Sequence, residues 1–388
     1  MMKFIKALCA LLAVALVACN EPNYGTETST TIASLGTPED NEIWFNTTDG
    51  KVLLSLDEDA FNTPIAEILY DEAGMNIIRF EGTLTTIGEE AFSYCHNIFN
   101  LSLPNSVTEI GERAFYDCKN MECLTLGYAL RTCKADAFDG CINLYSLHVP
   151  SIQSWCRISF ETRLANPLYY SETLIIDNNK IKELNIPEGT ESLSPYAFVS
   201  FYNLQTVNIP ASLRSVGKNA FEGCDNIKKV DVQSVKLWAS IEFETQLSNP
   251  LSFAEKLYHN GVEVTTLELT GVNEVYDYAF INCTSLHSLT ADDTLTAVGK
   301  DSFRNCTALT EVTLGSGIGL LGKQAFMNCK ELKRFTCKAQ TPPSLGNNDV
   351  FSYNHKERTF YVPATAIEAY KSEERWNKYA DSIKPIEN

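Results

Sequence analysis

Apolar residues recur along this chain in a pattern with a constant period. An Ala-Phe pair marks most repeats, and neighbouring pairs lie 23 residues apart. The Phe residues that keep this step are Phe92, Phe115 and Phe138, then Phe198 and Phe221, then Phe280, Phe303 and Phe326. A constant period between about 20 and 50 residues indicates stacked coils, each of which buries its apolar face only against its neighbours. We therefore predict a solenoid, whose long surface suits binding better than catalysis.

Each repeat contains the elements of one coil. After Phe comes an aliphatic pattern, L-x-x-L-x-L, which in one repeat is Ile98, Leu101 and Leu103. The last two positions are two residues apart, so they share one face of a short strand, and the following Pro104 ends that strand. A second apolar pair before Gly111 predicts another short strand and a tight turn. Stacked copies of these strands would be parallel and about 4.8 Å apart.

The repeat resembles the BspA-type leucine-rich repeat. The pattern A-F-x-x-C-x-x-L-x-x-L-x-L-P-x-x-V-x-x-I-G covers roughly residues 80–340. The resemblance implies a β-rich leucine-rich-repeat solenoid of stacked coils with parallel strands. It also implies a surface lipoprotein of anaerobic Gram-negative bacteria that binds host extracellular proteins or glycoproteins, or other bacterial surfaces. Because a fold does not determine a function, adhesion is an expectation by analogy.

Two insertions of about 37 residues interrupt the period. The intervals Ala137–Ala197 and Ala220–Ala279 are 60 and 59 residues long instead of 23. The segment Trp155–Leu168 matches the segment Trp238–Leu251 at an offset of 83 residues, so a larger unit has been duplicated.

Each insertion combines a Trp-containing segment with a predicted hairpin, whose turn is Asn178-Asn179 in one copy and Asn260-Gly261 in the other. We expect Trp155 and Trp238 to fix the inserted segments onto the stack. The alternative is an exposed aromatic platform that binds a glycan, formed by Trp155, Trp238, Tyr169 and Tyr170.

The beginning of the chain has the features of a lipoprotein signal. Lys3 and Lys6 precede an apolar stretch, Ala7–Val17, that is typical of a signal peptide and too short to span a membrane. Leu16-Val17-Ala18-Cys19 resembles a bacterial lipobox, in which the thiol of Cys19 takes the lipid. The alternative is an ordinary secretory signal that ends near Ala18. Since Asn20 rather than Asp follows Cys19, we expect an outer-membrane protein that faces the cell exterior.

These features divide the chain into five predicted parts. They are a signal peptide at 1–18, a lipidated flexible tether at 19–41, an N-terminal β cap at 42–80, the solenoid at 81–338 and a C-terminal cap at 339–388.

The cysteines follow the repeat. Of the thirteen, two belong to the signal and the lipid site, which leaves eleven. Their spacing is not that of a zinc site, and we expect buried thiols that behave as small apolar groups. Cys133 and Cys337 align with core positions, whereas Cys123 alternates with Leu124 and should face outward. We predict that Cys123 is the readily labelled thiol. Seven cysteines form a row three residues after Phe: Cys95, Cys118, Cys141, Cys224, Cys283, Cys306 and Cys329.

Charge and motifs argue against nucleic-acid binding and against catalysis. The formal charge is −18, and removal of Lys3 and Lys6 leaves 29 basic and 49 acidic residues, or −20. Such a polyanion needs local basic patches to bind nucleic acid, and the sequence shows none of sufficient density. The five His are not spaced as metal ligands, and no catalytic or nucleotide-binding motif is present. We expect no enzyme activity, no metal and no cofactor.

The outward positions of the main strands are the candidate binding face. They form two polar columns that either contact a ligand or are only solvated. We expect a monomer that binds a protein or glycoprotein through this face; the alternatives are a glycan-capturing lipoprotein and an envelope spacer without a specific ligand. The positions are Asn100, Ser102, Thr125, Ser146, His148, Thr206, Asn208, Lys229, Asp231, Ser288, Thr290, Glu311, Thr313 and Thr336.

Overall fold

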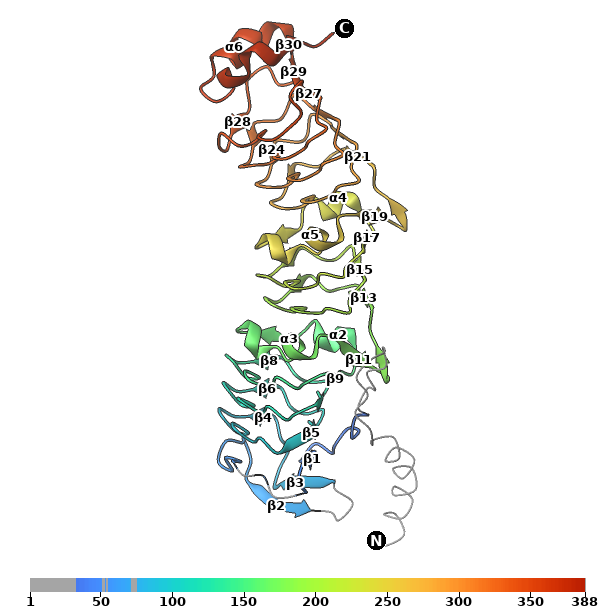
Figure 1. The fold of residues 1–388 in the computed structure, drawn as a ribbon, viewed down its shortest axis with the longest axis vertical. Coiled ribbons are helices and arrows are strands. Elements are labelled where there is room, and N and C mark those ends of the chain that lie inside the picture. Colours follow the sequence, from blue (N-terminus) through green and yellow to red (C-terminus); the bar gives the residue numbers. More distant parts are fainter. Residues whose placement is uncertain (1–32, 51–52, 54, 71–74, 388) are drawn as a thin grey trace. The chain divides into compact units, whose positions relative to one another are not determined.

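The structure is a computed structural model that describes residues 33–50, 53, 55–70 and 75–387 (Figure 1). The predicted signal peptide, Cys19 and most of the predicted tether therefore lie outside the described residues. No described helix is both long enough and apolar enough to cross a membrane.

The long strands of successive coils form three sheets, and within the repeats these strands are parallel, as predicted. The first sheet has the order β12-β11-β9-β7-β5-β1-β3-β2, and β1, β2 and β3 join it in antiparallel fashion. Its strands are β1 (Glu42–Thr47), β2 (Ile65–Tyr70), β3 (Asn76–Phe80), β5 (Ile98–Ser102), β7 (Cys123–Thr125), β9 (Ser146–His148), β11 (Leu174–Ile176) and β12 (Asn179–Lys180). The second contains β13 (Glu183–Asn185), β15 (Thr206–Ile209), β17 (Lys229–Val232), β19 (Leu257–His259) and β20 (Val262–Glu263). The third contains β21 (Thr266–Leu269), β23 (Ser288–Ala291), β25 (Glu311–Leu314), β27 (Arg334–Cys337), β29 (Thr359–Val362) and β30 (Ile383–Pro385).

A second row of two-residue strands follows the first, as the apolar pair before Gly predicts. These strands are parallel and also fall into three sheets. They are β4 (Thr86–Ile87), β6 (Glu109–Ile110), β8 (Thr132–Cys133) and β10 (Ser159–Phe160); β14 (Ser192–Leu193), β16 (Ser215–Val216) and β18 (Glu242–Phe243); and β22 (Glu274–Val275), β24 (Ala297–Val298), β26 (Leu320–Leu321) and β28 (Ser344–Leu345). Gly111 lies so close to the coil before it that an added Cβ would be 2.5 Å from the carbonyl carbon of Gly88, which explains the Gly.

The core is a stack of Phe rings between the two rows of strands. The rings of Phe280 and Phe303 lie 5.1 Å apart with an interplanar angle of 6°, and those of Phe303 and Phe326 lie 5.2 Å apart at 2°. The thiols of the Cys row are buried and free, as predicted. Five of them, Cys118, Cys141, Cys224, Cys306 and Cys329, donate to a Phe carbonyl of the coil before, as Cys329 Sγ does to Phe303 O at 3.2 Å.

Each insertion closes one group of coils and begins the next. The first contains α2 (Ile152–Trp155), a 3-10 turn at Arg163–Ala165 and α3 (Leu168–Ser171); the second contains α4 (Val235–Trp238), a 3-10 turn at Gln246–Ser248 and α5 (Leu251–Ala254). Trp155 and Trp238 are 0% and 1% exposed. Their indole nitrogens donate to Ala197 O at 2.9 Å and Ala279 O at 2.8 Å. Both Trp residues therefore fix the inserted segment onto the next coil.

After the last coils the chain forms a 3-10 turn at Ala364–Ala366, α6 (Ile367–Ser372) and another 3-10 turn at Asn377–Ser382. Trp376 is fully buried and donates from Nε1 to Pro343 O at 2.8 Å, and Tyr370 donates to Ala339 O at 3.0 Å. These contacts cover the apolar end of the stack, as a solenoid end requires.

Because Phe303 is stacked on both sides, Phe303→Ala should lower the free energy of unfolding by about 3–5 kcal/mol. Denaturant unfolding followed by far-UV circular dichroism measures the change. Thr310→Ala, at an exposed position of the next turn, is the control and should leave the unfolding midpoint nearly unchanged. A loss below about 1 kcal/mol for Phe303→Ala would show that the ring stack is not the main source of stability.

Candidate functional site

The predicted binding face is open on the second and third sheets. Side chains at the outward positions Thr206, Asn208, Lys229 and Asp231 of the second sheet are partly exposed. On the third sheet Thr290 and Glu311 are exposed, and Ser288 and Thr313 are partly exposed. On these two sheets the outward direction predicted from the alternation of side chains along each strand is therefore correct.

On the first sheet the prediction of an open face is wrong. Asn100, Ser102, Ser146 and His148 are all buried, at 7%, 0%, 0% and 6% exposure, and Thr125 is only partly exposed. The chain that precedes β1 lies on this face: Ser34 Oγ is 2.7 Å from Thr125 Oγ1. The segment expected to be a free tether up to residue 41 thus contacts the sheet in its described part, and alternation within a strand could not reveal this.

Two further outward positions need the same correction. Cys123, the predicted labelled thiol, is 1% exposed, and burial raises its pKa to about 12. It lies between Asn100 and Ser146 in register, so it shares their covered face. On the third sheet Thr336 is 6% exposed because its register neighbour Tyr361 is bulky, and the Arg334 guanidinium lies 3.9 Å from the centre of that Tyr ring.

The alternative aromatic platform does not form. Trp155 and Trp238 are buried, as described above, so they present no ring to a ligand. Tyr169 and Tyr170 are partly buried and pack edge to face, with ring centres 5.0 Å apart. The Tyr170 hydroxyl accepts from Gly140 N at 3.0 Å and lies 3.1 Å from Asp139 Oδ1. These four aromatic residues therefore hold the insertion in place.

A polar groove of about 380 Å³ lies on the face of the second sheet. Asn185, Asn208 and Asp231 line it from three neighbouring strands in one register column. The Asn208 amide donates to Asn185 Oδ1 and to Glu183 Oε1, both at 2.7 Å, so these side chains hold one another in place. Ile209 and Val232 also border the groove, but they are only 4% and 2% exposed and belong to the core.

Charged groups of both signs border this groove. Asp231 accepts from Lys229 Nζ at 2.9 Å and from Gly261 N at 2.9 Å, which ties the β19–β20 hairpin to the sheet. The hydrogen bond that Lys229 donates to the Asp231 carboxylate raises the pKa of Lys229. The Lys229 ammonium also lies 5.1 Å from the ring centre of Tyr258. The groove therefore offers amides, a carboxylate, an ammonium and an aromatic ring within a small area.

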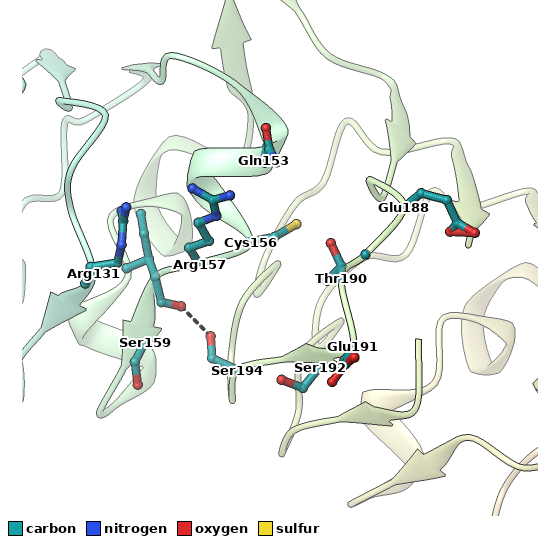
Figure 2. Close-up of a pocket in the computed structure, with 12 residues that line it drawn as sticks. Arg131, Gln153, Cys156, Arg157, Ser159, Glu188, Thr190, Glu191, Ser192 and Ser194 are labelled. Atoms are coloured by element: carbon teal, nitrogen blue, oxygen red, sulfur yellow. Dashed lines mark hydrogen bonds between the residues drawn. The ribbon is translucent and has the colours of Figure 1, made fainter. Parts of the chain in front are cut away.

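A larger cavity of about 760 Å³ opens beside this groove (Figure 2). Figure 2 shows Arg131, Arg157 and Cys156 on the α2 side, and Thr190, Glu188 and Glu191 on the facing loop. Ser194 bridges the two sides, since its hydroxyl donates to Ile158 O at 2.7 Å. Glu188 lines both the cavity and the groove, so the two hollows adjoin. We call them together the middle site.

The cavity exists because one coil lacks an apolar side chain. In other coils, the interior position before the second strand is an aliphatic residue that is at most 2% exposed. Thr190 occupies this position beside the cavity and is partly exposed. In addition, β10 and β14 belong to different sheets, so no ladder closes the gap. The aliphatic residues of this row are Val107, Leu130, Leu213, Val272, Leu295 and Ile318.

The duplicated unit provides an internal comparison. In the second copy Val272 stands at the place of Thr190 and Ala239 at the place of Cys156, and both are buried. The second insertion has a hollow of about 430 Å³, but it lies elsewhere and is lined by residues such as Val235, Lys236 and His259. The sequence shows that Thr190 stands where other coils have an aliphatic residue. It does not show that α2 lies across from Thr190, which is what leaves a cavity there.

Among the described residues, no group of three or more His, Cys, Asp or Glu side chains could hold a metal ion. The only described thiol that is not fully buried is Cys156, and burial still raises its pKa to about 12. A thiol with such a pKa is a weak nucleophile at neutral pH.

The sequence matches the family model described as "BspA type Leucine rich repeat region (6 copies)" over residues 63–163, 172–259 and 251–372. The chain belongs to this family. The expected fold class is therefore confirmed. The match covers the second insertion but leaves out residues 164–171 of the first. No curated protein matches the sequence.

Solved structures of bacterial leucine-rich repeat proteins are similar to this chain. A leucine-rich repeat protein from Bacteroides ovatus is 18% identical, with 90% of this chain and 99% of that chain covered and a TM-score of 0.38. A leucine-rich cell surface protein from Faecalibacterium prausnitzii is 19% identical, with 83% and 86% covered and a TM-score of 0.42. The pneumococcal vaccine antigen PcpA is 15% identical, with 83% and 86% covered and a TM-score of 0.38.

Labelling of the native protein with a small maleimide should modify Cys156 first among the eleven described thiols. The reaction should be slower than that of an unstructured cysteine, because a pKa of about 12 leaves little thiolate at pH 7.5. Mass spectrometry of the modified peptides gives the order of reaction.

Thr190→Leu restores the aliphatic row and should slow labelling of Cys156 several-fold, while Thr310→Ala should not change it. If Cys123 reacts as fast as Cys156, the first sheet is not covered in solution.

Proposed function

We propose that this protein is a non-catalytic cell-surface lipoprotein that binds a protein or glycoprotein at the middle site. Membership in the BspA-type leucine-rich repeat family supports a binding role, and stacked repeats offer extended surfaces for partners. The observation that carries the proposal is the contrast between sheets: the face of the first is covered, while the face of the second is open, polar and grooved.

The chemistry of the middle site supports a macromolecular ligand. Protein interfaces contain many hydrogen-bonding groups, and the groove offers amide and carboxylate side chains from three neighbouring strands. The adjoining cavity adds Arg131 and Arg157 on one wall and Glu188 and Glu191 on the other. A ligand segment that carries both a carboxylate and a basic group would meet complementary charges there.

The anchor is the second part of the proposal. We propose that the lipid on Cys19 attaches the protein to the outer membrane with the repeats facing the cell exterior. The basic residues Lys3 and Lys6, the apolar stretch Ala7–Val17 and the lipobox-like Leu16–Cys19 support this assignment. Acyl chains hold a protein to a membrane by about 0.8 kcal/mol per buried CH₂ group.

Asn208→Arg should abolish or weaken binding at least tenfold, because the long cationic side chain would fill the centre of the groove. Binding partners are first found by testing the full protein against immobilised extracellular-matrix proteins and host glycoproteins. Surface plasmon resonance then compares the variant with the unchanged protein.

Thr290→Arg is the matched control, since Thr290 occupies the same register position on the third sheet. It should bind as the unchanged protein does, and both variants should keep their melting temperatures. If Asn208→Arg binds as well as the unchanged protein, or if only Thr290→Arg loses binding, the ligand does not bind at the middle site. No binding to any immobilised protein would favour a spacer role.

A further inference from the structure

In the last coil, the position of the Cys row is occupied by Asn354 instead of a cysteine. Phe351 stacks on Phe326 at 5.8 Å with an interplanar angle of 8°, so it occupies the Phe position of a further coil. The backbone follows the repeat, because Asn328 N donates to Ser352 O as Asn305 N does to Met327 O. The residue three positions after Phe351 is Asn354, where the preceding coil has the buried Cys329.

Asn354 has hydrogen-bonding capacity that the protein does not use. Both its amide nitrogen and its amide oxygen are buried, and neither has a partner among the described residues. The thiol of Cys329, by contrast, donates to Phe303 O. Leaving a buried amide without partners is unfavourable, so a group that completes its hydrogen bonds would be favoured there.

Asn354 is one of six residues that line a hollow of about 340 Å³, and its two buried amide atoms lie behind that lining. The volume is near the lower end of the usual range for small-molecule sites, about 300–1,000 Å³. The other lining residues are Lys330, Tyr353, His355, Lys356 and Glu357. His355 Nδ1 accepts from Glu357 N at 3.1 Å, so the neutral ring carries its proton on Nε2 and is a donor there.

Tyr353 presents an aromatic ring at the rim. Its side chain is 73% exposed, and its φ of 60° is in the left-handed region that a bulky residue rarely adopts. The preceding coils have Asn282, Asn305 and Asn328 in this column, each with positive φ. Tyr353 thus replaces the Asn that the three preceding coils have in this column, next to Asn354, although the first coil also has a Tyr, Tyr94, in this position.

The hollow lies in the least acidic part of the chain. Residues 330–388 contain 10 basic and 8 acidic residues, a net charge of +2, whereas residues 1–329 contain 21 basic and 41 acidic residues, or −20. No ion pair with Lys330 or Lys356 occurs in the described part of the chain. Glu357 is the one carboxylate in the lining, so the lining is net positive.

We propose that this hollow, formed by Asn354, Tyr353, Lys330 and Lys356, is a second binding site that takes an anionic sugar. A carboxamide has two donors and an acceptor, which matches neighbouring sugar hydroxyls that both accept and donate. The exposed Tyr353 ring can cover the apolar face of a pyranose, and the two ammonium groups can hold its carboxylate or sulfate. This site is independent of the middle site and uses none of its residues.

An acidic peptide fits these observations less well. The lysines would attract it equally, but the buried Asn354 amide and the exposed Tyr353 ring would have no specific role. A sugar ring uses all three features within a volume that suits one or two rings.

Isothermal titration of the full protein with sialyllactose and with a heparin-derived disaccharide tests the proposal and separates carboxylate from sulfate recognition. At least one of them should bind, lactose should not, and added salt should weaken the affinity. Tyr353→Asn and Asn354→Cys should each reduce the affinity at least tenfold. Both substitutions restore residues found in the same columns of other coils, so both variants should remain folded.

Tyr94→Asn is the matched control, because Tyr94 has the same position in the first coil, is 52% exposed and has a φ of 58°. It should bind the sugar as the unchanged protein does. The proposal is overturned if neither anionic sugar binds at millimolar concentration, or if Tyr353→Asn and Asn354→Cys bind normally. An oligoglutamate peptide is a further control. If it binds as tightly as the sugars, and if Tyr353→Asn and Asn354→Cys do not weaken its binding, the hollow attracts anions only by charge.

Discussion

The register of one coil on the next is the constraint on which the rest of the structure depends. A residue in one coil meets the residue 23 positions later, so Phe stacks on Phe and each strand pairs with its own copy. Close approach of neighbouring backbones limits Gly111 to glycine. Since a coil cannot bury its apolar face alone, a change at one rung is felt mainly by its two neighbours.

The same constraint makes departures from the repeat informative. Thr190 breaks a row of buried aliphatic residues, and the largest hollow of the middle site opens beside it. Asn354 breaks the Cys row and leaves an amide without partners next to another hollow. Local rules fail most often where a protein binds something, because binding groups are kept at a cost in stability. Both proposed sites lie at such departures.

The period was sufficient to predict the coils, the parallel strands and the buried thiols of the Cys row, because each follows from residues that recur in register. The open face was predicted correctly only for the second and third sheets. Alternation along a strand shows which way Cys123 points, but it cannot show that the segment around Ser34 lies over that face. The middle-site cavity was missed because it needs the packing of α2 against a distant loop.

Equilibrium unfolding of the double variant Thr190→Leu/Asn354→Cys most directly tests whether the two departures are retained for binding. Both substitutions restore the residue type that the repeat has elsewhere. If the departures reduce stability, the variant should be more stable than the unchanged protein by about 2 kcal/mol, since the introduced Leu side chain would bury more apolar surface and an unpaired amide is removed. An unchanged or lower free energy of unfolding would show that Thr190 and Asn354 already fit the stack, and would contradict this interpretation.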